Sequence, residues 1–161
     1  MGKIKTTAER GKYKKEIQTA LYKNEEIRDL LLGDTTGMTA NGIRSAFKAH
    51  VKSHLFIDDT LTDADTYIFY DVRMPRIHST IKVCSVIMYL ICHRSIIENY
   101  TKEGYYGDRI DILSQMIEDT LVNHDVSMEF GIGSLNLDSI DIYNSSRFYG
   151  CIMTFSVPNF R

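Results

Sequence analysis

The segments TYIFYDVRM at Thr66–Met74 and TIKVCSVIMYLICH at Thr80–His93 decide the fold of this chain. In the first segment, apolar side chains alternate with more polar ones such as Asp71, and this period of two predicts a half-buried β-strand. Pro75 is expected to end the strand because proline cannot donate a hydrogen bond to a neighbouring strand. In the second segment both alternating sets are largely apolar, which predicts a strand in the middle of a sheet that is covered on both faces.

Three helical segments are predicted before these strands. The first begins at Tyr13, where apolar residues take up helical spacing. Asn24 is the predicted N-cap of the second helix, and Gly33 ends it. The third helix ends around Ser53, and its apolar face is expected to carry Ile43, Phe47, His50 and Val51.

The N-terminal segment 1–12 is polar and basic, and Ile4 is its one sizeable apolar side chain. Such a segment has little to bury, so it is predicted to be a flexible tail. Residues 13–161 are predicted to form a single domain, since one core is the usual arrangement for a chain of this length.

The second half of the chain returns to a helix and then to strands. Asp108 is a predicted N-cap for a helix that runs to about Asn123. An extended segment follows from Met128, and a strand over Phe148–Val157 comes after the turn residues Asn144-Ser145-Ser146. The order predicts an α+β fold, in which N-terminal helices and one later helix pack against a mixed, mainly antiparallel β-sheet.

Composition excludes several classes of protein. The 161 residues are 43% hydrophobic and have a net charge of −2, which disfavours a sequence-independent nucleic-acid binder. Three cysteines without a C-x-x-C spacing indicate neither a disulfide framework nor a zinc site. The best apolar run, Val83–Cys92, is about half of the roughly 20 residues that a membrane span needs. We therefore expect no membrane contact and synthesis in a reducing cytoplasm.

Candidate catalytic motifs are incomplete. His50 and His54 have the spacing of a zinc-binding pair on a helix, but Val51 stands where the general base is needed. Cys92 and His93 are neighbours, so on a strand they point to opposite faces and cannot form a thiolate–imidazole pair. We expect no catalytic residue, no metal site and no cofactor.

Two alternatives remain open from the residues themselves. Asp71, with acidic residues at 58, 59 and 65, is a candidate for Mg²⁺-dependent nuclease chemistry, although several converging oxygens would be required. Lysines around Tyr13 and Tyr22 are candidates for contact with nucleic acid or an acidic partner, although a solvated helix face is the ordinary interpretation.

The order of several short motifs resembles the tail terminator (tail completion) proteins of long-tailed bacteriophages. The resemblance spans about residues 13–157 and rests on short structural sequence motifs rather than on a catalytic signature. Those motifs are YKNEEIRDLL at 22–31, HLFIDDT at 54–60, TYIFYDV at 66–72, IMYLICH at 87–93 and GDRID at 107–111.

Membership of that family implies a non-enzymatic virion protein that assembles as a ring, typically a homohexamer, in the host cytoplasm. The ring would cap the tail-tube protein at the head-proximal end, stop tube growth and join the head–neck connector proteins. DNA would pass through the lumen of the ring without sequence-specific binding. Another head-to-tail connector, such as a head-closure or adaptor protein, is the alternative that the resemblance leaves open.

Contact surfaces for such an assembly are expected where charged or aromatic residues coincide with irregular backbone. Three segments meet this description: the loop 58–65, the loop 100–106 and the segment 128–145. The candidate interface residues within them are Asp58, Asp59, Asp63, Asp65, Tyr105, Tyr106, Phe130, Asp138 and Asp141.

Overall fold

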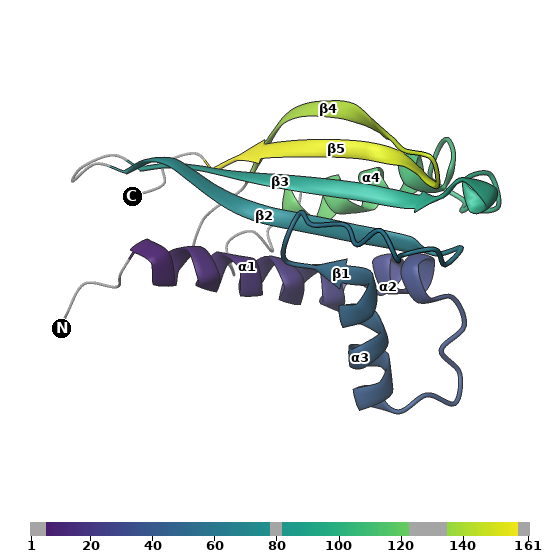
Figure 1. Ribbon diagram of the computed structural model, residues 1–161. Helices are drawn as coiled ribbons and strands as arrows, with labels where there is room; N and C mark the ends of the chain where they lie inside the picture. The colour runs from purple at the N-terminus through teal and green to yellow at the C-terminus, as the bar shows by residue number, and fades with distance from the viewer. Residues whose placement is uncertain (1–5, 78–81, 123–134, 158–161) are drawn as a thin grey trace.

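The two predicted strands around Thr66–Met74 and Val83–His93 are adjacent and antiparallel in the computed structural model, which describes residues 6–77, 82–122 and 135–157 (Figure 1). Strand β2 covers Thr66–Ile77 and strand β3 covers Lys82–His93. The remaining elements are α1 (Thr6–Lys23), α2 (Glu25–Leu32), α3 (Ala40–His50), β1 (Val51–Lys52), a 3₁₀ turn (Arg94–Ile96), α4 (Arg109–Leu121), β4 (Asn136–Asn144) and β5 (Phe148–Ser156).

The five strands form one sheet in the order β1-β2-β3-β5-β4, with β3 in its centre as predicted. β1 runs parallel to β2, and the other three neighbouring pairs are antiparallel. The predicted α+β fold with a mixed, mainly antiparallel sheet is confirmed. Among the described residues, no helix is both long and apolar enough to span a membrane.

β2 continues past Pro75, so the prediction that this residue ends the strand is wrong. Pairing with β3 resumes at Arg76 after a register shift that follows Arg73. β1 pairs only with Ile68 and Phe69, which leaves the rest of β2 as an edge of the sheet. A proline is tolerated at an edge and at a bulge because no neighbouring strand there needs its missing N–H.

The hydrophobic core lies between the helices and one face of the sheet. On β3, the side chains of Cys84, Val86, Met88, Leu90 and Cys92 are buried on this face. They pack with the apolar face of α1 and with α4, whose buried residues include Leu113 and Ile117. The helices thus bury the alternating set of β3 side chains from Cys84 to Cys92.

The opposite face of the sheet is only partly covered, so the prediction that β3 is covered on both faces is wrong. Ile91 is buried there in a small cluster with Tyr67, Phe69 and Phe148. Side chains of the loop between β1 and β2 pack on that cluster. Farther along β3, Ile87 is half-buried. Within the described residues, the buried cluster of this second face lies at one end of β3.

The N-terminal helix is longer than predicted. α1 begins at Thr6, so the predicted flexible tail of residues 1–12 is wrong for residues 6–12, while residues 1–5 lie outside the described residues. Arg10 explains part of the difference, because its guanidinium is anchored to β2. The predicted α2 is confirmed: the side chain of Asn24 accepts a hydrogen bond from the backbone N–H of Ile27, and Gly33 is the C-cap.

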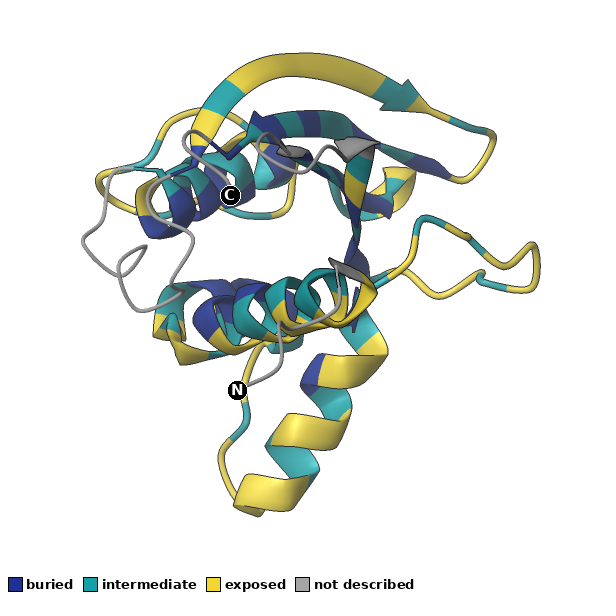
Figure 2. Cartoon of the chain, turned by 90° about the vertical axis from the view of Figure 1, so that its left-hand side faces the viewer, coloured by how far each residue is buried: buried dark blue, intermediate teal, exposed yellow. Residues whose placement is uncertain are grey.

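The third helix ends at His50, before the predicted end around Ser53. Val51 and Lys52 instead form β1, because Val51 can pair with Ile68 at the edge of the sheet. Phe47 is the buried residue of α3, whereas Ile43 is only half-buried. In Figures 1 and 2, α3 projects from the body of the molecule with most of its residues exposed.

The helix start predicted at Asp108 is confirmed by a complete capping box. The side chain of Asp108 accepts hydrogen bonds from the backbone N–H groups of Ile110 and Asp111, and the side chain of Asp111 accepts one from the backbone N–H of Asp108. Gly107 precedes this box with φ of 97°, and a Cβ placed on it would lie 2.4 Å from the Asp111 carboxylate. Glycine is therefore required immediately before the helix.

We predict that Asp108→Ala lowers the free energy of unfolding by about 1 kcal/mol, because two backbone donors at the start of α4 lose their acceptor. Equilibrium urea denaturation of the full chain measures this change. The matched control is Asp29→Ala, which removes an exposed carboxylate from α2 without removing a cap. Equal stability of the two variants would contradict the prediction.

Candidate functional site

The carboxylate of Asp71 contacts basic side chains and a backbone N–H group, which is the environment of a structural residue rather than of a metal ligand. One of its carboxylate oxygens lies 2.5 Å from the Arg10 guanidinium and 2.9 Å from the Lys14 ammonium. The same oxygen accepts a hydrogen bond from the backbone N–H of Val72, while Arg10 Nε donates to the Val72 carbonyl. These contacts fasten α1 along the free edge of β2 and satisfy its backbone groups.

His50 and His54, the predicted zinc-binding pair, have separate environments. His50 Nδ1 lies 2.8 Å from the Thr66 carbonyl oxygen, and its ring stacks on Tyr67 with a centroid separation of 5.1 Å. His54 lies beyond the end of α3, so the two histidines do not share a helix. Among residues 6–77, 82–122 and 135–157, no group of three His, Cys, Asp or Glu side chains could hold a metal ion.

The cysteines are poor nucleophiles in this fold. Burial raises the pKa of Cys84 and of Cys92 to about 11, and burial with nearby carboxylates raises the pKa of Cys151 to about 12. A thiol with such a pKa is almost entirely protonated at neutral pH, whereas the thiolate is the reactive form.

The predicted acidic loop lies at the partly covered face of the sheet. Asp58 accepts hydrogen bonds from the backbone and hydroxyl of Thr60, and these bonds lower the pKa of its exposed carboxyl group. The carbonyl oxygen of Asp59 accepts a hydrogen bond of 2.6 Å from Arg147. Asp63 and Asp65 form hydrogen bonds through their backbones. The backbone N–H of Asp65 donates to the carbonyl oxygen of Asp63, and the carbonyl oxygen of Asp65 accepts from the backbone N–H of His93.

The two tyrosines of the second predicted loop have different environments. Tyr105 is half-buried against the core, and its hydroxyl donates to Glu26 over 2.9 Å. Tyr106 is 81% exposed, although its backbone N–H donates to the side chain of Gln115. Of the pair, Tyr106 presents a ring at the surface, and Tyr105 is a packing residue.

The third predicted segment contains the outer strand of the sheet. Asp138 and Asp141 are exposed on β4, and Asp138 accepts a hydrogen bond from the Ser156 hydroxyl. Between and beside them stand Ile140 and Ile142, which are 56% and 73% exposed. Phe130, the remaining predicted residue, lies outside the described residues.

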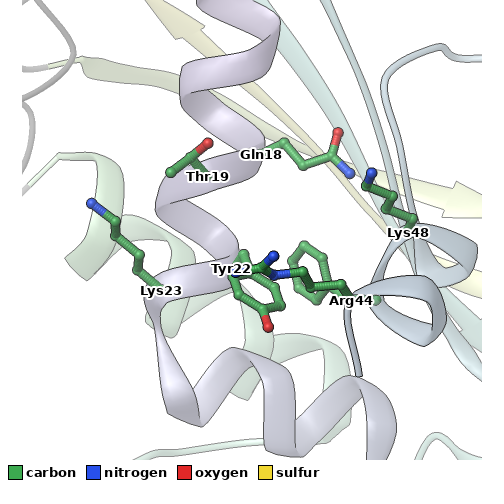
Figure 3. Close-up of a pocket in the computed structure, with 7 residues that line it drawn as sticks. Gln18, Thr19, Tyr22, Lys23, Arg44 and Lys48 are labelled. Atoms are coloured by element: carbon green, nitrogen blue, oxygen red, sulfur yellow. The ribbon is translucent and has the colours of Figure 1, made fainter. Parts of the chain in front are cut away.

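A pocket that the sequence did not reveal lies between α1 and α3 (Figure 3). It has a volume of about 360 Å³ and is lined by Gln18, Thr19, Tyr22, Lys23, Arg44, Phe47 and Lys48. Tyr22 and Phe47 meet edge to face with a centroid separation of 5.1 Å and supply an apolar floor. In Figure 3, Arg44 reaches from α3 towards Tyr22, and Gln18 and Lys48 point towards one another.

The pocket and β4 lie at opposite ends of the molecule. Figures 1 and 2 place α3 at the bottom and β4 at the top, with the body of the sheet between them. The pocket has basic side chains around an apolar floor. β4 exposes Ile140 and Ile142 on its helix-side face and Asp141 on its other face. This placement prevents the two surfaces of one chain from meeting each other.

The ion pair between Arg10 and Asp71 should contribute about 1 kcal/mol of coupling energy, because the pair is only partly exposed and shares its oxygen with Lys14. A double-mutant cycle of Arg10→Ala and Asp71→Ala in urea denaturation measures it, and added salt should reduce it. A cycle with Lys15→Ala, an exposed position of α1, is the control. Coupling no larger than in the control would contradict the assigned role.

Comparison with known proteins yields one assignment. No curated protein and no solved structure matches the chain. A sequence model of the YomW family matches residues 15–157, which include all of the sheet and the second half of α1. On this match across nearly its whole length, the chain belongs to the YomW family.

Proposed function

We propose that this protein is a structural virion component that forms a ring at the head-proximal end of a phage tail, caps the tail tube and joins the tail to the neck. The order of its motifs resembles tail terminator proteins, and YomW is a phage-derived family. The observation that carries the proposal is the pair of unlike surfaces at opposite ends of one small domain.

A closed ring of identical subunits requires two different patches on each subunit, related by a rotation that closes. An isologous dimer would instead use one self-complementary patch. The α1–α3 pocket and β4 differ in shape and in charge, as the two sides of a head-to-tail contact must.

The chemistry of the described side chains supports a role in assembly rather than in catalysis. The carboxylate with the most converging contacts, Asp71, is occupied by two cations and a backbone N–H. The protonated cysteines and the separated histidines supply no activated nucleophile.

A ring that DNA crosses must avoid holding phosphate groups. Each phosphate that a Lys or Arg side chain neutralises strengthens retention. The loop between β1 and β2 presents exposed carboxylates, including Asp58 and Asp63, and suits a surface past which DNA slides.

Deletion of the gene from its phage tests the proposal. We expect tails of abnormal and variable length, because nothing would stop addition of tube subunits, and we expect few tails joined to heads. Electron microscopy of lysates, with tube length measured for each particle, provides the readout. Complementation with the wild-type gene should restore a uniform length.

The same images separate the alternatives. Tails of normal length that remain detached from heads would contradict a terminator and identify a head-closure or adaptor protein. Labelled protein at the portal side of the neck rather than at the tube end would lead to the same conclusion. Normal, fully joined particles would remove the virion role altogether.

A further inference from the structure

The α1–α3 pocket lies between two rows of exposed polar side chains. Each row follows a spacing of three or four residues, which places its members on one side of a helix. The rows are Asn41, Arg44 and Lys48 on α3 and Lys15, Thr19 and Lys23 on α1. Members of both rows line the pocket, so the rows face one another across it (Figure 3).

This end of the molecule is basic, although the chain as a whole is not. α1 and α3 together contain seven Lys and Arg residues and two acidic residues, whereas the whole chain has a net charge of −2. Arg44 and Lys48 are four residues apart on a helix without an acidic residue, and like charges at this spacing repel. Within the described residues, neither side chain forms a hydrogen bond or an ion pair. The low net charge therefore averages a basic end with an acidic remainder.

Two hydrogen-bond donors converge in the pocket from the two helices. The side-chain oxygen of Gln18 lies 3.4 Å from the Tyr70 hydroxyl, which leaves the amide nitrogen of Gln18 for the pocket. In Figure 3, this nitrogen and the ammonium group of Lys48 point towards one another. Neither group can accept a hydrogen bond, so an oxygen atom placed between them would receive a bond from each. The pair therefore favours an anionic oxygen as its ligand.

Tyr22 gives the pocket an aromatic surface in a fixed position. Its half-buried ring lines the pocket and meets Phe47 edge to face. Phe47 is itself 1% exposed, so it supports Tyr22 from within the core rather than meeting a ligand. The Arg28 guanidinium lies 5.1 Å from the centroid of the Tyr22 ring and restrains it from α2. An aromatic ring held among basic groups is the arrangement on which nucleic-acid bases stack.

We propose that the α1–α3 pocket of the free subunit binds a single strand of nucleic acid, with one base against Tyr22, its phosphate between Gln18 and Lys48, and neighbouring phosphates along the two basic rows. Phosphate contacts combine Lys and Arg with neutral donors, as Asn41 and Thr19 provide here. From Asn41 to Lys48 the α3 row rises by about 10 Å, which matches about three nucleotides at a stacked spacing of roughly 3.4 Å.

The shape of the site favours a single strand over other anionic polymers. A volume of about 360 Å³ is at the small end of ligand sites, which suits one nucleotide of a chain. A base in a duplex is stacked and paired, so it cannot enter a recess between two helices without leaving the stack. A carboxylate-rich peptide would pair with the cations but would leave the Tyr22 ring without a flat partner.

Strand binding goes beyond the proposed function, because it concerns the subunit before assembly. The pocket is one of the two unlike surfaces that a ring contact could use, so a strand and a neighbouring subunit would compete for it. Once a neighbour covers the pocket, its basic groups no longer hold phosphate. Such competition is compatible with a ring through which DNA slides.

Fluorescence anisotropy of the full-length protein with a labelled oligothymidylate of about twelve nucleotides tests the site. We expect binding that weakens as salt rises. The slope of log affinity against log salt should be about −2, because Lys15, Arg44 and Lys48 neutralise three phosphates at about −0.7 each. A duplex of the same length should bind on the order of tenfold more weakly, because its bases are not available to Tyr22.

Single charge removals locate the strand. At 0.1 M salt, Arg44→Gln should weaken binding about fivefold and make the salt slope shallower by about 0.7, because one phosphate contact is lost. Lys48→Gln should have the same effect. The matched control is Arg73→Gln, an exposed residue of β2 on the face opposite to the helices. It removes the same charge and should change the affinity by less than about twofold.

The aromatic contact has its own variants. Tyr22→Leu should weaken binding about tenfold without changing the salt slope, because stacking rather than phosphate neutralisation is lost. Tyr22→Phe keeps the ring and should bind like the parent protein. Gln18→Glu leaves the packing of Tyr22 intact but places a carboxylate beside Lys48, and it should weaken binding by at least as much as Lys48→Gln. Urea denaturation establishes that each variant is folded.

The same measurements include the results that contradict a single-strand site. Absence of oligothymidylate binding, or duplex binding of equal strength, excludes a base in the pocket. Thymidine 5′-phosphate that binds as tightly as the oligonucleotide assigns the pocket to free nucleotides. Binding that the Arg44, Lys48 and Tyr22 variants leave unchanged places the strand elsewhere.

An oligoglutamate of equal length tests the peptide alternative. If it binds, oligothymidylate does not, and Arg44→Gln weakens the binding, then the pocket is a site for acidic peptides and the proposal is wrong. None of these results bears on tail length in the deletion phage, because capping of the tube does not require a strand in the pocket. The two proposals therefore fail separately.

Discussion

One-sided burial of the central strand is the constraint on which the rest of the structure depends. The helices cover the alternating set of β3 side chains from Cys84 to Cys92, and that contact fixes where α1 and α4 lie. Among the described residues, the helical layer reaches Leu137 at the start of β4 but leaves Ile140 and Ile142 exposed. These exposed isoleucines of the outer strand are the apolar side of the surface proposed for assembly.

The two edges of the sheet differ in whether other parts of the chain bind their backbone groups. At the β2 edge, Arg10 and Asp71 bind the free backbone groups of Val72, so that edge is closed at this residue by contacts within the chain. The β4 edge has no such closure among the described residues. A protein with both edges open would polymerise in either direction, whereas one closed edge restricts strand-mediated contacts to a single side.

The sequence predicted those features that local chemistry controls. The alternation in β2, the continuous apolar character of β3 and the caps at Asn24 and Asp108 each have a signal within a few residues. Features that depend on distant segments had no such signal. The two-residue strand β1 exists because Ile68 lies beside Val51, and the pocket exists because Phe47 packs on Tyr22. Ile140 and Ile142 looked like ordinary strand residues, since only the finished fold determines where the helices stop.

The position of β5 between β3 and β4 has a consequence for synthesis on the ribosome. β3 acquires its second neighbour only when Phe148–Ser156 has emerged, and β4 is held in the sheet by that same late strand alone. A nascent or prematurely terminated chain that lacks β5 therefore cannot display β4 in its folded position. The strand order therefore makes the place of β4 in the sheet depend on translation through β5.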